Sequence, residues 1–330
     1  MTSRLFLAGL VSLVLAVARA EAPSAESSLD CIDPLIGTEG VGSEYGGMMP
    51  MVGVPFGSFQ MVPMTRLNRV GQLSFNSSDD TLIGFILTRQ PAIWMGDWGE
   101  VRIPIEPRRI VRAEYAPFVA RVVAGDRTYA FTATAHAAWL RGDLRDVRLS
   151  DGYSSNRDDA NLGAELPNFR GWRCVRRVPG GLQIGVSLLS LEQARANLAA
   201  EIGEKSFETV IAETKAEWAR YFDRVRIDAP DDVKTIFYTG LYHTLLYPRQ
   251  IDEGGRYYSA FDDRMHDGVA YSCYSLWDTY RAEHPWLTLI APDRWRVKRV
   301  TLNGRELADW RVRHADLVRG GDLVFEMQTP

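Results

Sequence analysis

Residues 271–292 read YSCYSLWDTYRAEHPWLTLIAP. The run Ser-Leu-Trp-Asp-Thr-Tyr-Arg opens a predicted helix and presents Trp277, Asp278 and Arg281 close together at its start. An indole ring packs on the C–H face of a pyranose, while a carboxylate and a guanidinium hydrogen-bond adjacent hydroxyls. The stretch therefore predicts a helix that begins at a sugar-binding pocket. A purely structural alternative stays open, in which Asp278 and Arg281 form an i,i+3 ion pair and Trp277 packs in the core.

Helical periodicity begins near residue 190 and leads up to this stretch. Apolar and aromatic residues follow one face of Ser206–Val225, whose first residue is a suitable N-cap. Asp231–Tyr247 repeats the pattern, with either of two aspartates at its start as the expected cap and Pro248 as its stop. Ser275–Ile290 is the third predicted helix, kinked or divided at Pro285. Three helices are too few to close a helical domain, so helices are expected to be missing before the β pattern that follows.

The chain before these helices, from Cys31 to about Ser190, has the pattern of a β protein. Its apolar runs are short, some of them alternate with polar residues, and Gly and Pro separate them, which is typical of a β-sandwich. A β pattern returns after Arg294. The predicted strands are 81–87, 101–105, 127–134, 173–178 and 182–189 before the helices, then 297–302 and 323–327, with a turn at 303–304 between these last two.

The N-terminus has the pattern of a secretory signal peptide. Arg4 is the basic start, residues 5–17 are the apolar core, and Ala18-Arg19-Ala20 is a cleavage site, so cleavage is expected after Ala20. The apolar run is too short to cross a bilayer comfortably, although a membrane anchor remains the alternative. We therefore expect a secreted or periplasmic protein without a membrane partner, whose mature chain starts with a disordered segment, 21–28.

Bulk composition narrows the classes of function. The 330 residues, 46% of them hydrophobic, suffice for one large or two ordinary globular domains. The net charge of −4 argues against nucleic acid as a partner, because phosphate binding requires a basic surface. Three cysteines (Cys31, Cys174 and Cys273) allow one disulfide at most, and no two of them have the spacing of zinc ligands. Asn76-Ser77-Ser78 is a glycosylation sequon.

A second aromatic segment, residues 91–100, reads PAIWMGDWGE. It places Trp94 and Trp98 around Gly96 and Asp97, an arrangement that suits a sugar-binding platform. The alternative is a turn between strands with buried indoles. Separately, the acidic segment 262–267 is compatible with calcium, but it lacks a regular ligand array, so a solvated loop is the favoured interpretation. The chain contains no phosphate-binding loop, no H-E-x-x-H and no G-x-S-x-G motif.

Taken together, these stretches resemble the calcium-dependent exo-α-mannosidases of glycoside hydrolase family 92. The resemblance extends in order over nearly all of the chain after the signal peptide. The matching runs are IDPLIGT, VPFG, TLIGF…TRQPAIWMGDWGEV, GYSSNR…LGAELPNFRGW, SLLSLEQARANL, KTIFYTGLYHTLLYPR, RYYSAFDD, YSLWDTYRAEHPWLTLIAP, VTLNG and GGDLVFEM.

This resemblance implies an α+β multi-domain fold. An N-terminal β-sandwich precedes the first helices of an (α/α)6 barrel, here incomplete, and a short C-terminal β element follows. The implied domains are the signal peptide 1–20, the disordered segment 21–28, the β-sandwich 29–190, a linker helix with truncated barrel helices 191–294, and the C-terminal β segment 295–330.

The resemblance also implies a chemistry, hydrolysis of terminal α-mannosyl residues (α-1,2 is the expected linkage) with inversion. One carboxyl group protonates the leaving oxygen and another activates water, while a calcium ion holds the mannose hydroxyls. The family's catalytic carboxylates and most of its calcium ligands lie in a part that this chain skips at Arg294–Trp295. No catalytic residue or metal ligand is therefore identified here. The implied substrate-binding residues are Trp94, Asp97, Trp98, Trp277, Asp278 and Arg281.

Three hypotheses for the function follow from this pattern. In the first, the protein is an exported α-mannosidase of this family, active in processing mannose-containing glycans, whose displayed chain is shortened and inactive. In the second, it is a secreted protein that binds mannose-rich glycans without cleaving them. In the third, it is a remnant that does not fold, because the opened barrel exposes the helix face of Phe237, Leu241 and Leu245.

Overall fold

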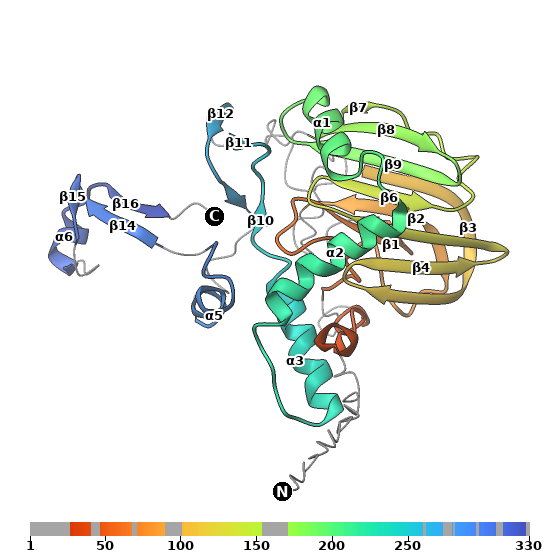
Figure 1. Ribbon diagram of the computed structural model, residues 1–330, viewed down its shortest axis with the longest axis horizontal. Coiled ribbons are helices and arrows are strands. Elements are labelled where there is room, and N and C mark those ends of the chain that lie inside the picture. The colour runs from red at the N-terminus through yellow and green to blue at the C-terminus, as the bar shows by residue number, and fades with distance from the viewer. Residues whose placement is uncertain are drawn as a thin grey trace, which may run out of the picture.

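The computed structural model describes residues 27–40, 47–67, 71–89, 101–153, 171–259, 262–272, 279, 281–294, 297–307 and 313–327. A β-sandwich forms the main body, helices pack on it, and three small sheets follow (Figure 1). The predicted fold class is confirmed. Ser27 and Ser28 were expected to belong to a disordered segment, but Ser27 caps the 3-10 helix η1 (Ser28–Cys31).

Nine described strands form one antiparallel sheet that folds over into two layers. Their order is β1-β2-β3-β4-β5-β6-β9-β8-β7. The bounds are β1 Gln60–Met64, β2 Thr81–Thr88, β3 Val101–Ala116, β4 Val119–Ala124, β5 Arg127–Ala133, β6 Ala137–Arg141, β7 Gly152–Tyr153, β8 Trp172–Val178 and β9 Gly181–Ser187.

The long strand β3 carries the chain from one layer to the other. Residues 101–109 of β3 pair with β2, and residues 110–116 pair with β4. The register shifts between Ile110 and Arg112, and such an irregularity bends a strand. The layers then meet face to face, since the Phe85 ring on β2 lies 5.2 Å from Tyr129 and 5.5 Å from Phe131 on β5. Two layers with a shared core are a sandwich.

Strands β1 and β2 are buried on both faces because helices cover their outer side. Met61 and Phe85 point into the sandwich core, whereas Val62, Met64 and Ile86 belong to a second apolar cluster. That second cluster contains the aromatic faces of α2 (Phe207–Phe222) and α3 (Asp231–Thr244). Because successive side chains point to opposite faces, one face of these strands packs in the sandwich core and the other packs against the helices.

Helix α1 (Leu191–Glu201) packs on β8 and β9, and α2 crosses toward α3 (Figure 1). Ser190 caps α1 by accepting from the Gln193 amide, and Ser206 caps α2 by accepting from the Thr209 amide, as predicted for Ser206. The predicted aspartate cap of α3 is wrong. Pro230 is the N-cap residue there and makes no side-chain cap bond, so Asp231 and Asp232 are in the first turn instead.

The start of the predicted helix 275–290 lies largely outside the described residues. The described helix α5 spans Glu283–Ile290, and Pro285 lies in its first turn, where no intrahelical donor is needed. A further expectation about the helices is corrected. The helix face expected to be exposed is largely covered, because Leu241 and Leu245 are buried against the aromatic residues of α2 and α3. The exposed apolar residues on these helices are Val233 and Ile236 of α3 and Leu289 of α5.

Three small sheets complete the described chain. β10 (Arg249–Gln250) pairs with β13 (Tyr271–Ser272). β11 (Arg256–Ser259) pairs with β12 (Arg264–Asp267), so the acidic segment that was interpreted as a solvated loop lies largely in a hairpin.

β14 (Val297–Leu302) lies between β15 (Arg305–Glu306) and β16 (Leu323–Met327), apart from the sandwich (Figure 1). The predicted 303–304 turn is confirmed, with positive φ at Asn303 and Gly304. A short helix, α6 (His314–Val318), precedes β16.

The structure bears on the glycosylation sequon, on one cysteine and on the length of the described helices. Asn76 of the sequon is 1% exposed and its Nδ2 donates to the Gly40 carbonyl, so the folded chain does not present it for glycosylation. Cys174 is a buried free thiol that donates to the Ala194 carbonyl and is therefore not part of a disulfide. Among the described helices, none combines the length and the apolar character needed to cross a bilayer.

Candidate functional site

The predicted sugar-binding residues fall on two segments that lie mostly outside the described part of the chain. Trp94, Asp97 and Trp98 belong to 90–100, and Trp277 and Asp278 belong to 273–278. Arg281 is described, and it is exposed just before α5. The structure does describe the residues that flank both segments. Their arrangement shows where the two segments start.

Arg249 connects the starting points of the two predicted sugar-binding segments. The segment 90–100 follows β2, which ends at Thr88, and the segment 273–278 follows β13, which ends at Ser272. Arg249 pairs with Ser272 through the backbone of β10, and its Nη1 donates to the Thr88 carbonyl at 2.8 Å. The strand ends that precede the two segments are therefore both in contact with Arg249, one through its side chain and the other through its backbone.

The Arg249 guanidinium is fully buried, and the hydrogen bonds that the structure gives it go to uncharged oxygens. Besides Thr88, it donates to the Gln60 side-chain oxygen at 2.5 Å and lies over the Tyr247 ring, 5.0 Å from the centroid. A buried cation is costly unless hydrogen bonds satisfy it. Such a group holds its neighbours in one arrangement, because each of them would lose a charge-assisted bond on moving.

A polar cavity of about 540 Å³ opens at the junction of the sandwich and the helices. The loop Val54–Gly57 and the turn Thr134–His136 form the sandwich side. The end of α1 and the middle of α2 form the helical side, and Gln250 and Arg294 complete the lining. The volume is in the range of small-molecule sites.

The carboxylates on the cavity wall are all engaged in ion pairs. Glu201 lies 2.7 Å from His136, and Glu213 lies 2.7 Å from Lys205. Glu217 lies 3.1 Å from Arg220, its i+3 neighbour on α2. A carboxylate held by a cation has a weakened tendency to take up a proton at neutral pH. Glu201, whose pKa is lowered by His136, is therefore poorly suited to act as the general acid of a hydrolysis.

Arg294 supplies the cavity with a cation whose hydrogen-bond partners are neutral. Its Nε donates to the Tyr221 hydroxyl at 2.7 Å and its Nη1 to the Gln250 side-chain oxygen at 2.5 Å. The guanidinium lies 5.2 Å from the centre of the Phe56 ring. Phe56 itself has a φ of 58°, a conformation that is strained for a residue with a bulky side chain. Backbone strain of this kind is concentrated at functional sites in proteins.

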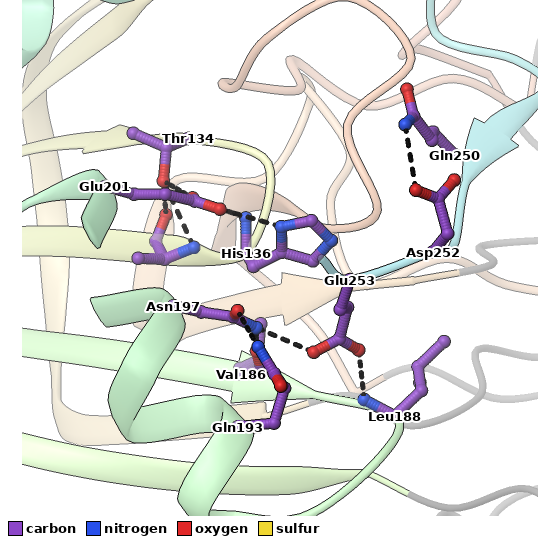
Figure 2. A network of polar contacts seen from close by, with 11 residues as sticks. Thr134, His136, Val186, Leu188, Gln193, Asn197, Glu201, Gln250, Asp252 and Glu253 are labelled. Carbon is purple, nitrogen blue, oxygen red and sulfur yellow. Dashed lines mark hydrogen bonds and ion pairs between the residues drawn. The ribbon is translucent and has the colours of Figure 1, made fainter. Parts of the chain in front are cut away.

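A buried polar network lies beside the cavity (Figure 2). In one part of it His136 is paired with Glu201; in another Glu253, with 2% exposure, accepts from the Leu188 amide and the Asn197 side chain at 2.7 Å each. Burial alone would raise the pKa of Glu201, but the hydrogen bond and charge of His136 lower it. Glu201 is therefore ionised.

Glu283 is the described carboxyl group with acid-like character. It is the first residue of α5, two residues after Arg281. Burial raises its pKa from the ordinary 4.5 to about 7. A carboxyl group with such a pKa can hold a proton at neutral pH and release it, which is what a general acid must do.

The metal implied by the sequence resemblance was tested against the described side chains. Within that part of the chain, no group of three or more His, Cys, Asp and Glu residues could hold an ion. The hairpin carboxylate Asp262 is paired with His266 at 2.9 Å, and Asp263 accepts from the Tyr258 hydroxyl. The described residues thus do not fit a calcium site, and no step is derived through calcium.

Several residues of this region were missed at the level of sequence. His136, Glu201 and Arg294 lie outside the matching runs, and Arg249 ends the run KTIFYTGLYHTLLYPR without any sign of its role, because the partners of these residues are far away along the chain. The run of cationic and acidic residues around them is ordinary for a surface. Only the fold brings them together.

Comparisons with known proteins identify what the chain is similar to. The model of the N-terminal domain of glycosyl hydrolase family 92 matches residues 31–107, and the model of the catalytic domain of that family matches residues 193–296. No curated protein matches the chain.

Solved structures match over most of this chain but over less than half of theirs. The family GH92 inverting mannosidase BT2199 from Bacteroides thetaiotaomicron VPI-5482 matches with a TM-score of 0.68 at 23% identity, over 81% of this chain and 46% of the mannosidase. The family GH92 α-mannosidase BT3965 from Bacteroides thetaiotaomicron matches with a TM-score of 0.62 at 18% identity, over 80% of this chain and 47% of the other. The chain thus spans about half the length of the solved structures that it matches.

Proposed function

The chain belongs to glycoside hydrolase family 92, and from this we propose that it recognises terminal α-mannosyl residues of glycans. Arg249 is the observation that carries the proposal. It ties the start of the segment with Trp94, Asp97 and Trp98 to the start of the segment with Trp277 and Asp278. The proposal assigns these residues, with Arg281, to one sugar pocket.

We further propose that this chain binds the sugar without cleaving it. An inverting glycosidase needs an acid and a base on opposite sides of the scissile bond, about 6.5–9.5 Å apart. The carboxylates that line the described cavity are committed to ion pairs. The match covers 46% and 47% of the two mannosidases. Losing an acid or a base typically costs about 10²–10⁴-fold in rate.

Membership of the family is the sole reason to consider calcium. The described residues do not supply a calcium site, so sugar binding is proposed to depend on aromatic stacking and on charge-assisted hydrogen bonds. A chelator is then expected to leave the affinity unchanged.

A second candidate function, hydrolysis of α-mannosides, is favoured by one observation. Glu283 lies next to the predicted pocket, and burial raises its pKa to about 7. If Glu283 protonates a leaving group, then mannose is released and E283Q abolishes the release. This candidate still requires a base, which the described residues do not identify.

Export is a separate proposal that rests on the signal-peptide pattern of residues 1–20. The mature protein would begin at Glu21 and meet glycans outside the cell or in the periplasm. N-terminal sequencing of protein recovered from that compartment tests it.

Titration calorimetry tests the recognition of mannose. We expect α-1,2-mannobiose to bind with a millimolar dissociation constant, galactobiose to bind at least tenfold more weakly, and W98A to remove binding. W139F is the control, because Trp139 packs against Phe207 at the junction of β6 and α2. Equal binding of the two disaccharides would refute recognition of mannose.

A further inference from the structure

Three separate parts of the fold meet at His136. It lies in the turn between β5 and β6, next to the last turn of α1 and next to the chain that follows β10 (Figure 2). The sandwich contributes the histidine, α1 contributes Glu201, and the segment after β10 contributes Asp252 and Glu253, whose charges act on the histidine. The hydrogen bonds of each carboxylate show which of them depends on the charge of the histidine.

Glu201, the last residue of α1, is bound to the turn by several hydrogen bonds. Its Oε1 lies 2.7 Å from His136 Nδ1, and its Oε2 accepts from the His136 amide at 2.8 Å. The Thr134 hydroxyl also donates to Oε2. The exposed fractions of the two side chains are 12% for His136 and 22% for Glu201, so water screens the pair only weakly.

Asp252 and Glu253 are bound by uncharged donors. Glu253 accepts from the Leu188 amide and from Asn197, while Asp252 accepts from the Ala270 amide at 3.2 Å and from Gln250 at 3.3 Å. Both are more than nine-tenths buried. Buried carboxylates are unstable without a nearby cation.

We propose that protonated His136 is a latch that holds α1 and the segment 250–253 against the sandwich, and that loss of its proton loosens both. The protonated ring donates to Glu201 and provides the positive charge for Asp252 and Glu253. A neutral ring leaves three buried carboxylates close together with no compensating charge on the turn. Their mutual repulsion then favours separation of the helical side from the sandwich.

The other charged groups around the cavity do not replace the histidine. Lys205 is held by Glu213 and by the Glu201 carbonyl, and Arg294 is held by Tyr221 and Gln250. Glu213 and Glu217 of α2, which line the same cavity, add negative charge. Deprotonation of His136 therefore leaves an excess of carboxylates at the junction.

The direction of the pH dependence follows from these contacts. Burial alone would lower the pKa of His136, but the hydrogen bond and charge of Glu201, with the charges of Glu253 and Asp252, raise it above 6.5. A group whose pKa is raised on folding contributes stability that is fully present below its unfolded-state pKa. That contribution is lost as the pH rises through the higher, folded-state pKa.

Two measurements on the chain from residue 21 test the latch. NMR titration of the imidazole signals, assigned with H136Q, should show His136 protonated at pH 7. Thermal unfolding of the wild type should show a midpoint that falls by several degrees as the pH rises past that titration. In H136Q the midpoint should be lower at pH 6 and should not follow this step. E201Q, which keeps the imidazole, should move the His136 titration to lower pH.

H266Q is the matched control. His266 is also paired with a carboxylate, Asp262, but that pair is 38% and 43% exposed on a hairpin. We expect its loss to leave the step in the midpoint unchanged. A His136 that is neutral at pH 6.5, or a step that survives in H136Q, would overturn the proposal. Because no glycan takes part, either result is independent of the proposed recognition of mannose.

Discussion

Arg249 and Thr88 are 161 residues apart in the sequence, yet the guanidinium of one donates to the main-chain oxygen of the other at 2.8 Å. Thr88 ends β2, and Arg249 begins the strand that pairs with Ser272. The bond therefore fixes the relative position of the two strand ends, Thr88 and Ser272, that precede the predicted sugar-binding segments. Loss of the side chain should affect stability and glycan binding together.

Replacement of Arg249 by Met should lower the free energy of unfolding by about 3 kcal/mol, because buried carbonyls and the Gln60 side chain lose their donor. Urea unfolding measures this change, and calorimetry with mannobiose should show weaker binding. R109M is the control, since Arg109 is 82% exposed and lies 3.8 Å from Asp80. Similar losses in the two variants would contradict the role given to Arg249.

A pair of glycine substitutions tests the packing of α1 on the sandwich. A Cβ on Gly185 of β9 would lie 2.2 Å from the Ala194 carbonyl oxygen and 2.7 Å from the Leu198 Cβ, so G185A must push α1 away. We expect a loss of about 2–4 kcal/mol. At Gly240 of α3 nothing lies within 4 Å, and G240A should stabilise the chain by up to about 1 kcal/mol. Chemical denaturation should give opposite signs, and equal signs would show that α1 is misplaced.

Two buried tyrosines differ in whether the hydroxyl makes a hydrogen bond. The Tyr242 hydroxyl donates to the Met51 carbonyl at 2.7 Å, whereas the buried Tyr129 hydroxyl has no hydrogen-bond partner among the described residues. Y242F should therefore cost about 1–2 kcal/mol, and Y129F should be neutral or slightly stabilising. Thermal or urea unfolding of the two variants checks the difference. A larger loss for Y129F would contradict it.

Glu283 should make the stability depend on pH in the direction opposite to that of a salt-bridged carboxylate. Its folded-state pKa, about 7, is above the ordinary 4.5, so the folded state binds the proton more tightly. Stability should fall as the pH rises from about 4.5 to 7 and then stay low. E283Q should raise stability at pH 8 by about 1–2 kcal/mol, less than the full shift implies because part of the group remains in water.

E204Q is the control for this effect, because Glu204 is 95% exposed. Unfolding of the wild type and both variants between pH 4 and pH 8 gives the comparison. If E283Q leaves the pH profile unchanged, then Glu283 is not buried as described, and the second candidate function loses its acid.

The elements that the sequence predicted well are those whose signal is local. Ser206 caps α2 through a bond to a residue three positions away, and the Asn303-Gly304 turn requires a positive φ at each residue. The strands β2, β5, β8 and β9 were likewise anticipated from short apolar runs between glycines and prolines. Each of these depends on neighbours in the chain, so one sequence suffices.

The missed elements depend on contacts that are distant in the chain. β3 continues to Ala116 although no residue of its second half is buried, because β4 pairs with it there. The hairpin of β11 and β12 contains the acidic residues that made it look like a solvated loop. The expected cap residues Asp231 and Asp232 are the first two residues of α3, and the N-cap position is that of Pro230.

The candidate site likewise has a part that the sequence indicated and a part that depends on contacts distant in the chain. Aromatic and charged residues in the segments 91–100 and 273–281 indicated a sugar pocket before any fold was known, and those residues remain a prediction. The roles of Arg249, His136 and Glu201 gave no signal, although Arg249 ends a matching run, because these roles arise from partners that lie 65 or more residues away.

A saturation-transfer NMR spectrum of α-1,2-mannobiose with the chain from residue 21 tests the central claim most directly. It reports binding through transfer to the disaccharide protons, and hydrolysis through the anomeric signals of free mannose. We predict transfer without free mannose, both in calcium and after addition of a chelator. Free mannose that appears only with calcium would show that the chain is a working mannosidase, and absence of transfer from folded protein would show that it does not recognise mannose.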